Sequence, residues 1–126
     1  MVTTVMAKIL VVDDDSLSRQ NITRFLSEDG HSVEQAADGS EALELLKSGH
    51  FDLVLSDILM PKINGYAVIE FVHSTLPDTS VLLMTAYGGT RPASSRGVEI
   101  VMKPINLDEL CAAIRRLLAK KSINPK

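Results

Sequence analysis

Five short apolar runs, separated by segments with helical periodicity, constrain the fold of this 126-residue chain more than any other feature. They are rich in Ile, Val and Leu, which is typical of strands buried on both faces of a sheet. The runs lie at residues 8–12, 32–36, 53–55, 81–84 and 100–102. Because regular alternation of strands and helices produces a parallel sheet covered by helices on both faces, we predict a three-layer α/β fold.

Helix signals occupy the segments between these runs, with one exception. Leu17 and Ile22 begin an apolar face after the first run, and Asp38 and Asn106 are each followed by a Glu three residues later, a capping pattern. Residues 86–97 instead contain three glycines, a proline and three Ser or Thr residues. We therefore predict that the fourth helix is shortened or irregular.

The length and composition fit one small domain. We predict an N-terminal extension at residues 1–6, a folded domain at 7–121 and a C-terminal tail at 122–126. The apolar runs are far shorter than the ~20 residues that cross a membrane, and residues 1–6 do not resemble a signal peptide. The single Cys fits a reducing compartment, so we predict a cytoplasmic protein that contacts no membrane. A net charge of −3 gives no electrostatic basis for direct nucleic-acid binding.

Polar residues follow four of the five runs. Asp13 and Asp14 follow the first, Asp57 the third, Thr85 the fourth and Lys103 the fifth. Because the carboxyl ends of parallel strands lie along one edge of the sheet, where ligands bind in open α/β folds, we expect these side chains to converge. The acidic residues and Lys103 also have ordinary interpretations: an acidic helix start for the Asp run, a turn residue for Asp57 and a solvated side chain for Lys103.

The chemistry of this set favours metal-assisted phosphoryl transfer. Three adjacent carboxylates repel one another unless a cation lies among them, and ligands that are all oxygen favour a hard ion such as Mg²⁺. A hydroxyl and an ammonium suit an oxyanion attached to one of the carboxylates. Carboxylates act as nucleophiles that form aspartyl phosphates, and this transfer needs positioning and charge neutralisation above all.

Four motifs stand at the predicted strand ends. They are, in order, Val11-Val12-Asp13-Asp14-Asp15, Asp57-Ile58-Leu59-Met60-Pro61 with Asn64-Gly65, Met84-Thr85-Ala86, and Lys103-Pro104. Together they resemble the receiver domain of response regulators in two-component signalling, over residues 7–119 approximately. The resemblance implies a flavodoxin-like (βα)5 fold with strand order 2-1-3-4-5.

The resemblance implies a magnesium site and a phosphoacceptor. Asp57 would accept the phosphoryl group. Asp14 and Asp57 would bind Mg²⁺ directly, Asp13 would act through water, and the backbone carbonyl of Leu59 would supply another ligand.

The resemblance also implies the residues that respond to the phosphoryl group. Thr85 would donate its hydroxyl to it. Lys103 would pair with Asp57 before transfer and with a phosphoryl oxygen afterwards. Pro104 would follow a cis peptide bond that aims the lysine inward.

Two features depart from the family pattern. Receivers usually carry Tyr or Phe three residues before the lysine, where this chain has Ile100, and Lys103 follows Thr85 by only 18 residues. That interval is short by roughly one helical turn. Tyr87 is a candidate to gate the pocket or to replace the missing aromatic ring, and its alternative is a loop residue without a role.

The predicted function is a phosphorylation-activated signalling switch, not a turnover enzyme. Its donor would be a histidine kinase or phosphotransfer protein, its target an unknown downstream protein, and the chain a monomer or weak dimer. One alternative is a degenerate receiver that acts as a phosphorylation-independent interaction module. A less favoured one is a Mg²⁺-dependent small-molecule phosphatase, which would need an acid or base two residues after the nucleophile, where Leu59 stands.

Overall fold

The computed structural model describes residues 6–58, 65–85 and 99–123. Within them, five parallel strands form one sheet in the order β2-β1-β3-β4-β5, as predicted. The strand bounds are β1 (Lys8–Val12), β2 (Ser32–Ala36), β3 (Leu53–Asp57), β4 (Ser80–Thr85) and β5 (Glu99–Met102). Strand β3 continues two residues beyond its predicted apolar run, because Ser56 and Asp57 still pair in register with β4.

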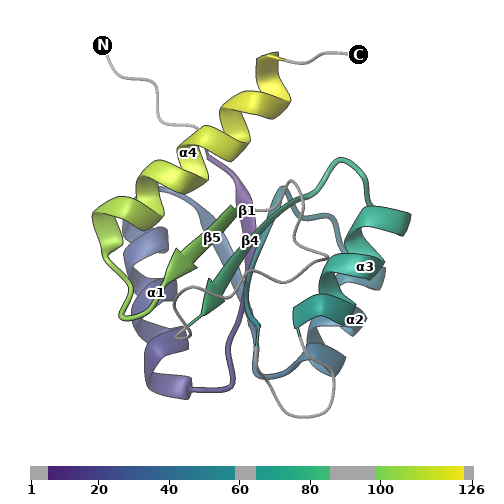
Figure 1. Ribbon diagram of the computed structural model, residues 1–126, viewed down its shortest axis with the longest axis horizontal. Coiled ribbons are helices and arrows are strands. Elements are labelled where there is room, and N and C mark those ends of the chain that lie inside the picture. The colour runs from purple at the N-terminus through teal and green to yellow at the C-terminus, as the bar shows by residue number, and fades with distance from the viewer. Residues whose placement is uncertain (1–5, 59–64, 86–98, 124–126) are drawn as a thin grey trace.

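Helices cover both faces of the sheet (Figure 1). In the described residues they are α1 (Ser16–Glu28), α2 (Gly39–Ser48), α3 (Gly65–Thr75) and α4 (Leu107–Ile123). Figure 1 shows α1 and α4 on one side of the strands and α2 and α3 on the other. None of the described helices has the length and apolar character to cross a bilayer.

Short polar side chains begin the helices, as their sequence pattern predicts. Asp15 accepts hydrogen bonds from the backbone N–H groups of Leu17 and Ser18 at the start of α1. At α2, Asp38 accepts from the Glu41 N–H, and the Glu41 carboxylate accepts from the Ala37 N–H in return. These bonds satisfy N–H groups that the first helical turn leaves without partners.

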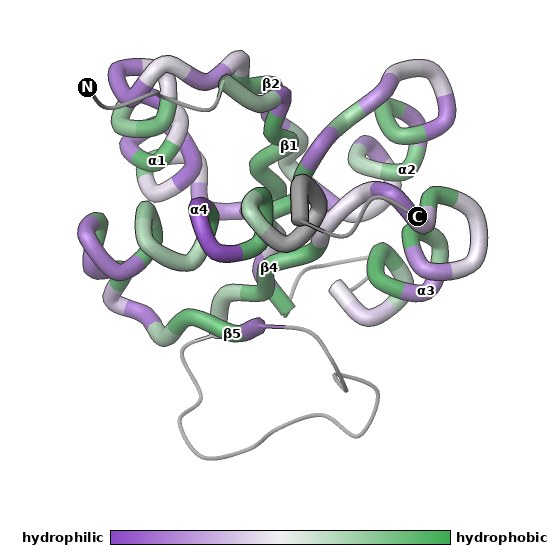
Figure 2. The backbone as a smooth tube through the Cα atoms, turned by 90° about the horizontal axis from the view of Figure 1, so that it is seen from above, coloured by the Kyte–Doolittle hydropathy of each residue, from purple (hydrophilic) through white to green (hydrophobic). Residues whose placement is uncertain are grey.

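The core has two halves, one on each face of the sheet. Successive residues of β1 alternate between them, with Ile9 and Val11 facing α1 and α4, and Leu10 and Val12 facing α2 and α3. All four side chains are fully buried, and Figure 2 shows the hydrophobic colour gathered along β1 and β4. Leu17 is an exception to its helix pattern: it is 66% exposed, in the first turn of α1, whereas Ile22 is buried.

Several predictions from the sequence lie outside the described residues. They concern the ligand carbonyl of Leu59, the role of Tyr87, the irregular fourth helix at 86–97, and most of the terminal segments.

Candidate functional site

The predicted polar residues lie at one edge of the sheet. Asp13 and Asp14 follow β1, Asp57 is the last residue of β3, Thr85 is the last of β4, and Lys103 follows β5. Neighbouring strands end level with one another: the Lys103 N–H donates to the Thr85 carbonyl at 2.8 Å. The parallel register therefore brings together side chains that are far apart in the sequence.

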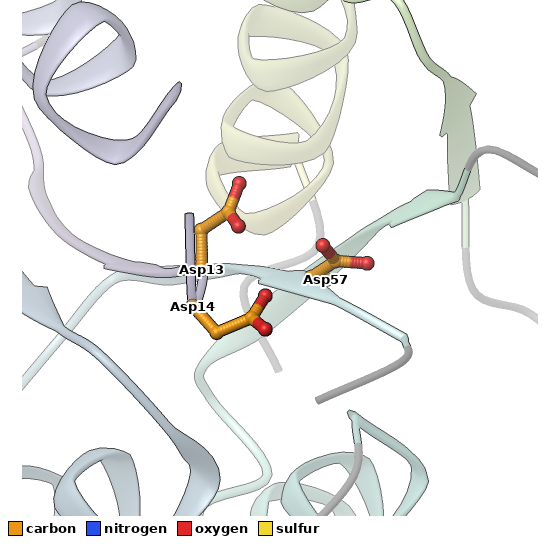
Figure 3. A group of neighbouring side chains, drawn as sticks. All are labelled: Asp13, Asp14 and Asp57. Atoms are coloured by element: carbon orange, nitrogen blue, oxygen red, sulfur yellow. The ribbon is translucent and has the colours of Figure 1, made fainter. Parts of the chain in front are cut away.

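Three carboxyl groups gather at this edge (Figure 3). Each of Asp13, Asp14 and Asp57 offers an oxygen within 4.8 Å of the others. Asp13 is fully buried and Asp57 nearly so, whereas Asp14 is exposed. Burying like charges side by side is unfavourable without a compensating cation. The all-oxygen donor set, open to solvent on the Asp14 side, fits a hard divalent cation.

Lys103 supplies positive charge to this acidic cluster. Its Nζ donates to Asp57 Oδ2 at 2.7 Å and lies 3.4 Å from Asp13 Oδ2. Burial by itself lowers the pKa of Lys103, but the hydrogen bond to Asp57 and the negative charges of Asp13 and Asp57 outweigh it, so the pKa is raised. The ammonium is therefore charged at neutral pH. The Lys103–Pro104 peptide is cis, as the resemblance implies.

Asp13 is held by its backbone as well as by its side chain. Its N–H donates to the Ala36 carbonyl at 3.2 Å, and its Oδ1 accepts from the Asp15 N–H at 2.9 Å. Its carbonyl accepts from Arg19 Nη1 at 2.7 Å. Arg19 is not among the site residues expected from the sequence, and only its place one turn into the helix after the Asp run could have indicated this contact.

Gly65, which belongs to one of the quoted motifs but has no role assigned from the sequence, packs against the site. It is the buried first residue of α3, and its N–H donates to the Ile58 carbonyl at 2.8 Å. A Cβ atom there would lie 2.5 Å from the Asp57 carbonyl oxygen and 2.9 Å from the Ile58 Cα. Only glycine permits this close approach of α3 to the backbone of Asp57.

The residues predicted to respond to phosphorylation lie farther apart than the three carboxyl groups, on strands β4 and β5. Thr85 is buried at the end of β4, next to the strand that carries Asp57. Ile100 lies on β5 opposite Leu83 and is packed, partly buried, against the core half beneath α2 and α3. On the same strand, Glu99 accepts two hydrogen bonds from the Arg116 guanidinium, at 2.7 and 3.1 Å, which join β5 to α4.

An open groove of about 430 Å³ lies beside Lys103, between α1 and the start of α4. Two of the few exposed large apolar side chains, Leu17 at 66% and Leu107 at 39%, line it. The other lining residues are Asp15, Ser18, Asn21, Ile22, Lys103, Pro104 and Ile105.

Comparison with known proteins identifies relatives along nearly the whole chain. The family profile described as the response regulator receiver domain matches residues 9–115. Response regulator MprA of Mycobacterium sp. (strain KMS) is 39% identical over 123 residues, which are 91% of this chain and 52% of the relative. The chain thus spans about half the length of the curated relatives it matches.

Solved structures agree in fold. Response regulator TrrA of Thermotoga maritima, determined in complex with Mg²⁺–BeF, has a TM-score of 0.82 and 38% identity, covering 87% of this chain and 97% of that one. A CheY-like receiver domain protein of Methanospirillum hungatei has a TM-score of 0.85 and 28% identity, covering 94% and 98%.

Proposed function

Since the chain belongs to the response regulator receiver family, the phosphoryl-accepting switches of two-component signalling, we propose that Asp57 is the residue that accepts the phosphoryl group. The observation that carries the proposal is the contact of 2.7 Å between Asp57 and the Lys103 ammonium, within a cluster of three carboxyl groups. Asp13 is less accessible to a phosphodonor because it is fully buried, whereas Asp57 is 8% exposed.

The proposed donor is a phosphohistidine of a histidine kinase or phosphotransfer protein. An Asp57 carboxylate oxygen attacks the phosphorus, a P–O bond forms, and the P–N bond breaks as the imidazole leaves and takes up a proton. Lys103 neutralises negative charge on the transferred group, and the Thr85 hydroxyl donates to one of its oxygens.

The same site would hold Mg²⁺. Asp13, Asp14 and Asp57, with the Leu59 carbonyl, would bind it, and the ion would neutralise phosphoryl oxygens during transfer. The TrrA complex with Mg²⁺–BeF supports this assignment by analogy. The product is the modified chain itself, so we propose a switch and not a turnover enzyme.

The phosphoryl group would act on the surface formed by β4, β5 and α4. When Thr85 turns toward it, the end of β4 moves relative to β5, where Ile100 takes the place of the usual aromatic ring. Because the ion pair between Glu99 and Arg116 connects β5 to α4, a movement of β5 would also displace α4. Binding of a downstream protein would then change as the population of the two states changes. A complete set of site residues favours this switch over a phosphorylation-independent module.

A protein donor fits the surroundings of the site. The groove beside Lys103 presents Leu17 and Leu107, apolar surface that a small phosphodonor does not need.

The proposal of no direct nucleic-acid contact applies to these 126 residues alone, because the relatives are about twice as long. The bounds of the domain, the cytoplasmic location and the oligomeric state, a monomer or weak dimer, remain predictions.

Intact-protein mass spectrometry tests the proposal. The chain is incubated with an acyl phosphate and Mg²⁺, and we expect one phosphoryl adduct that disappears in Asp57→Asn. Asp78→Asn, at an exposed turn before β4, is the matched control and should be modified like the wild type. An adduct of wild-type size in Asp57→Asn would disprove the assignment, and the absence of any adduct in the folded wild type would favour the interaction module.

A further inference from the structure

Arg19 contacts the acidic site from outside its ligand set, and we propose that it is a positioning residue for the metal. It lies in α1, and its guanidinium donates to the backbone carbonyl of Asp13 at 2.7 Å. The inference rests on the proposed function, because it concerns the same Mg²⁺ site.

The carbonyl that Arg19 holds belongs to the peptide between two of the acidic residues. A peptide group is planar, so fixing the Asp13 carbonyl also fixes the direction in which the chain enters Asp14. Asp14 is exposed, and core packing does not restrain its side chain. The orientation of this peptide therefore determines where the Asp14 carboxylate lies relative to Asp13 and Asp57.

A second hydrogen bond fixes the guanidinium itself. Arg19 Nε donates to Gln35 Oε1 at 3.1 Å, and Gln35 lies on β2 beside Ala36, whose carbonyl accepts the Asp13 N–H. Because the guanidinium is planar and its donors are rigidly spaced, two bonds in different directions restrain it well. Arg19 thus connects β2 to the loop after β1 at the point where that loop carries the acidic residues.

The attachment of α1 does not depend on Arg19. Ile22 and Leu26 bury the helix against the core, and Asp15 caps it. The other bonds of Asp13 act on its N–H and its carboxylate, whereas Arg19 acts on its carbonyl. Loss of the guanidinium should therefore loosen the Asp13–Asp14 peptide while the helix stays in place.

The test is magnesium affinity measured without phosphodonor. Calorimetric titration of Arg19→Ala should give a dissociation constant about tenfold higher than the wild type, the lower end of what loss of an outer-shell partner causes. Arg19→Lys, which keeps a positively charged donor but not the planar guanidinium, should lie between the two, and Gln35→Ala should show a smaller change in the same direction. Arg24→Ala is the matched control: it removes an exposed arginine of the same helix that contacts Asn21, and should bind Mg²⁺ like the wild type.

Two further readouts separate positioning from general destabilisation. Urea unfolding in chelator should show a small loss of stability for Arg19→Ala. In the phosphorylation assay, the Mg²⁺ concentration for half-maximal rate should rise more than the maximal rate falls. If Arg19→Ala does not fold, Arg19→Lys and Gln35→Ala decide by their Mg²⁺ affinity.

Two results would overturn the inference, and they are distinguishable. A wild type that binds Mg²⁺, with all folded Arg19 and Gln35 variants binding it equally well, leaves the proposed function intact and makes Arg19 purely structural. A wild type that does not bind Mg²⁺ overturns the metal site and the role of Arg19 together.

Discussion

The two ends of the sheet both carry carboxylates, but they balance the charge differently. At the amino end, Asp52 accepts from the Lys8 N–H at 2.9 Å and lies 3.5 Å from His50 Nε2. At the carboxyl end, three carboxyl groups cluster, and the ammonium of Lys103 contacts two of them, Asp57 and Asp13. Carboxylates matched to protein donors hold the chain together, whereas an excess of negative charge at one edge favours a cation that the chain itself does not supply.

Asp29 illustrates the amino end further. It lies beyond α1 and accepts from the Cys111 thiol of α4 at 3.2 Å, with His31 Nε2 at 3.7 Å and Arg115 Nη2 at 3.9 Å. Burial, followed by the hydrogen bond and charge of Asp29, raises the pKa of Cys111, so the thiol stays protonated. This carboxylate joins α1 to α4 and is a structural group.

The largest expected effect is a loss of stability when one methyl group is added at the carboxyl end of the sheet, compared with the same addition at the amino end. Gly65→Ala places a Cβ against the backbone of Asp57, and the clash can be relieved only if the backbone shifts. We therefore expect a loss of about 2–3 kcal/mol in the free energy of unfolding. Gly49→Ala is the control at the amino end, because a Cβ there meets its neighbours at 3.5 and 3.6 Å, an ordinary contact. Urea unfolding of both variants measures the difference. Equal losses would show that the carboxyl end is no more tightly packed than the amino end.

Addition of Mg²⁺ should have the next largest effect, and only through the carboxyl end. At ten times its dissociation constant, an ion that binds the folded state alone raises the free energy of unfolding by about 1.4 kcal/mol. We expect this increment in the wild type and in Asp52→Ala, and its loss in Asp14→Ala or on addition of chelator. Thermal unfolding with and without Mg²⁺ measures it. An increment that survives Asp14→Ala would locate the ion elsewhere.

The smallest expected effect is a pH dependence at the amino end. Burial lowers the pKa of His31, and Arg115 adds to this, against the opposing charge of Asp29. His31 Nδ1 accepts from the Ala7 N–H, which requires the neutral ring. The unfolded chain therefore takes up the proton first, so stability present above the usual histidine pKa, about 6.5, is lost as pH falls through the lower folded value.

Urea unfolding between pH 7 and 5 tests this dependence. The wild type should lose stability more steeply than His31→Gln on acidification, and the exposed His50→Gln should behave like the wild type. Identical slopes for the wild type and His31→Gln would show that His31 does not contribute.

The strands and helix starts could be predicted because they depend on local pattern. The apolar runs predicted strands buried on both faces, and Asp38 and Asn106 accept the capping bonds that their spacing indicates. The convergence of the acidic residues with Lys103 followed from parallel topology. Their roles in phosphoryl transfer remain predictions.

The contacts that could not be predicted from the sequence depend on distances between elements. Arg19 looks like any surface arginine until α1 packs over the loop after β1, and Gly65 looks like a turn residue until α3 approaches Asp57. Cys111 is half-buried, and its thiol donates to Asp29, 82 residues earlier in the chain. Pattern within one element carries no information about such contacts.

The sequence distance between Asp13 and Lys103, 90 residues, has a consequence for folding. Closing a loop of this length costs chain entropy before the contact can form. During synthesis the acidic residues emerge well before the lysine that pairs with them. An incomplete chain therefore lacks the ammonium beside Asp57, and under the role proposed for Lys103 it would accept a phosphoryl group only after the last strand has joined the sheet.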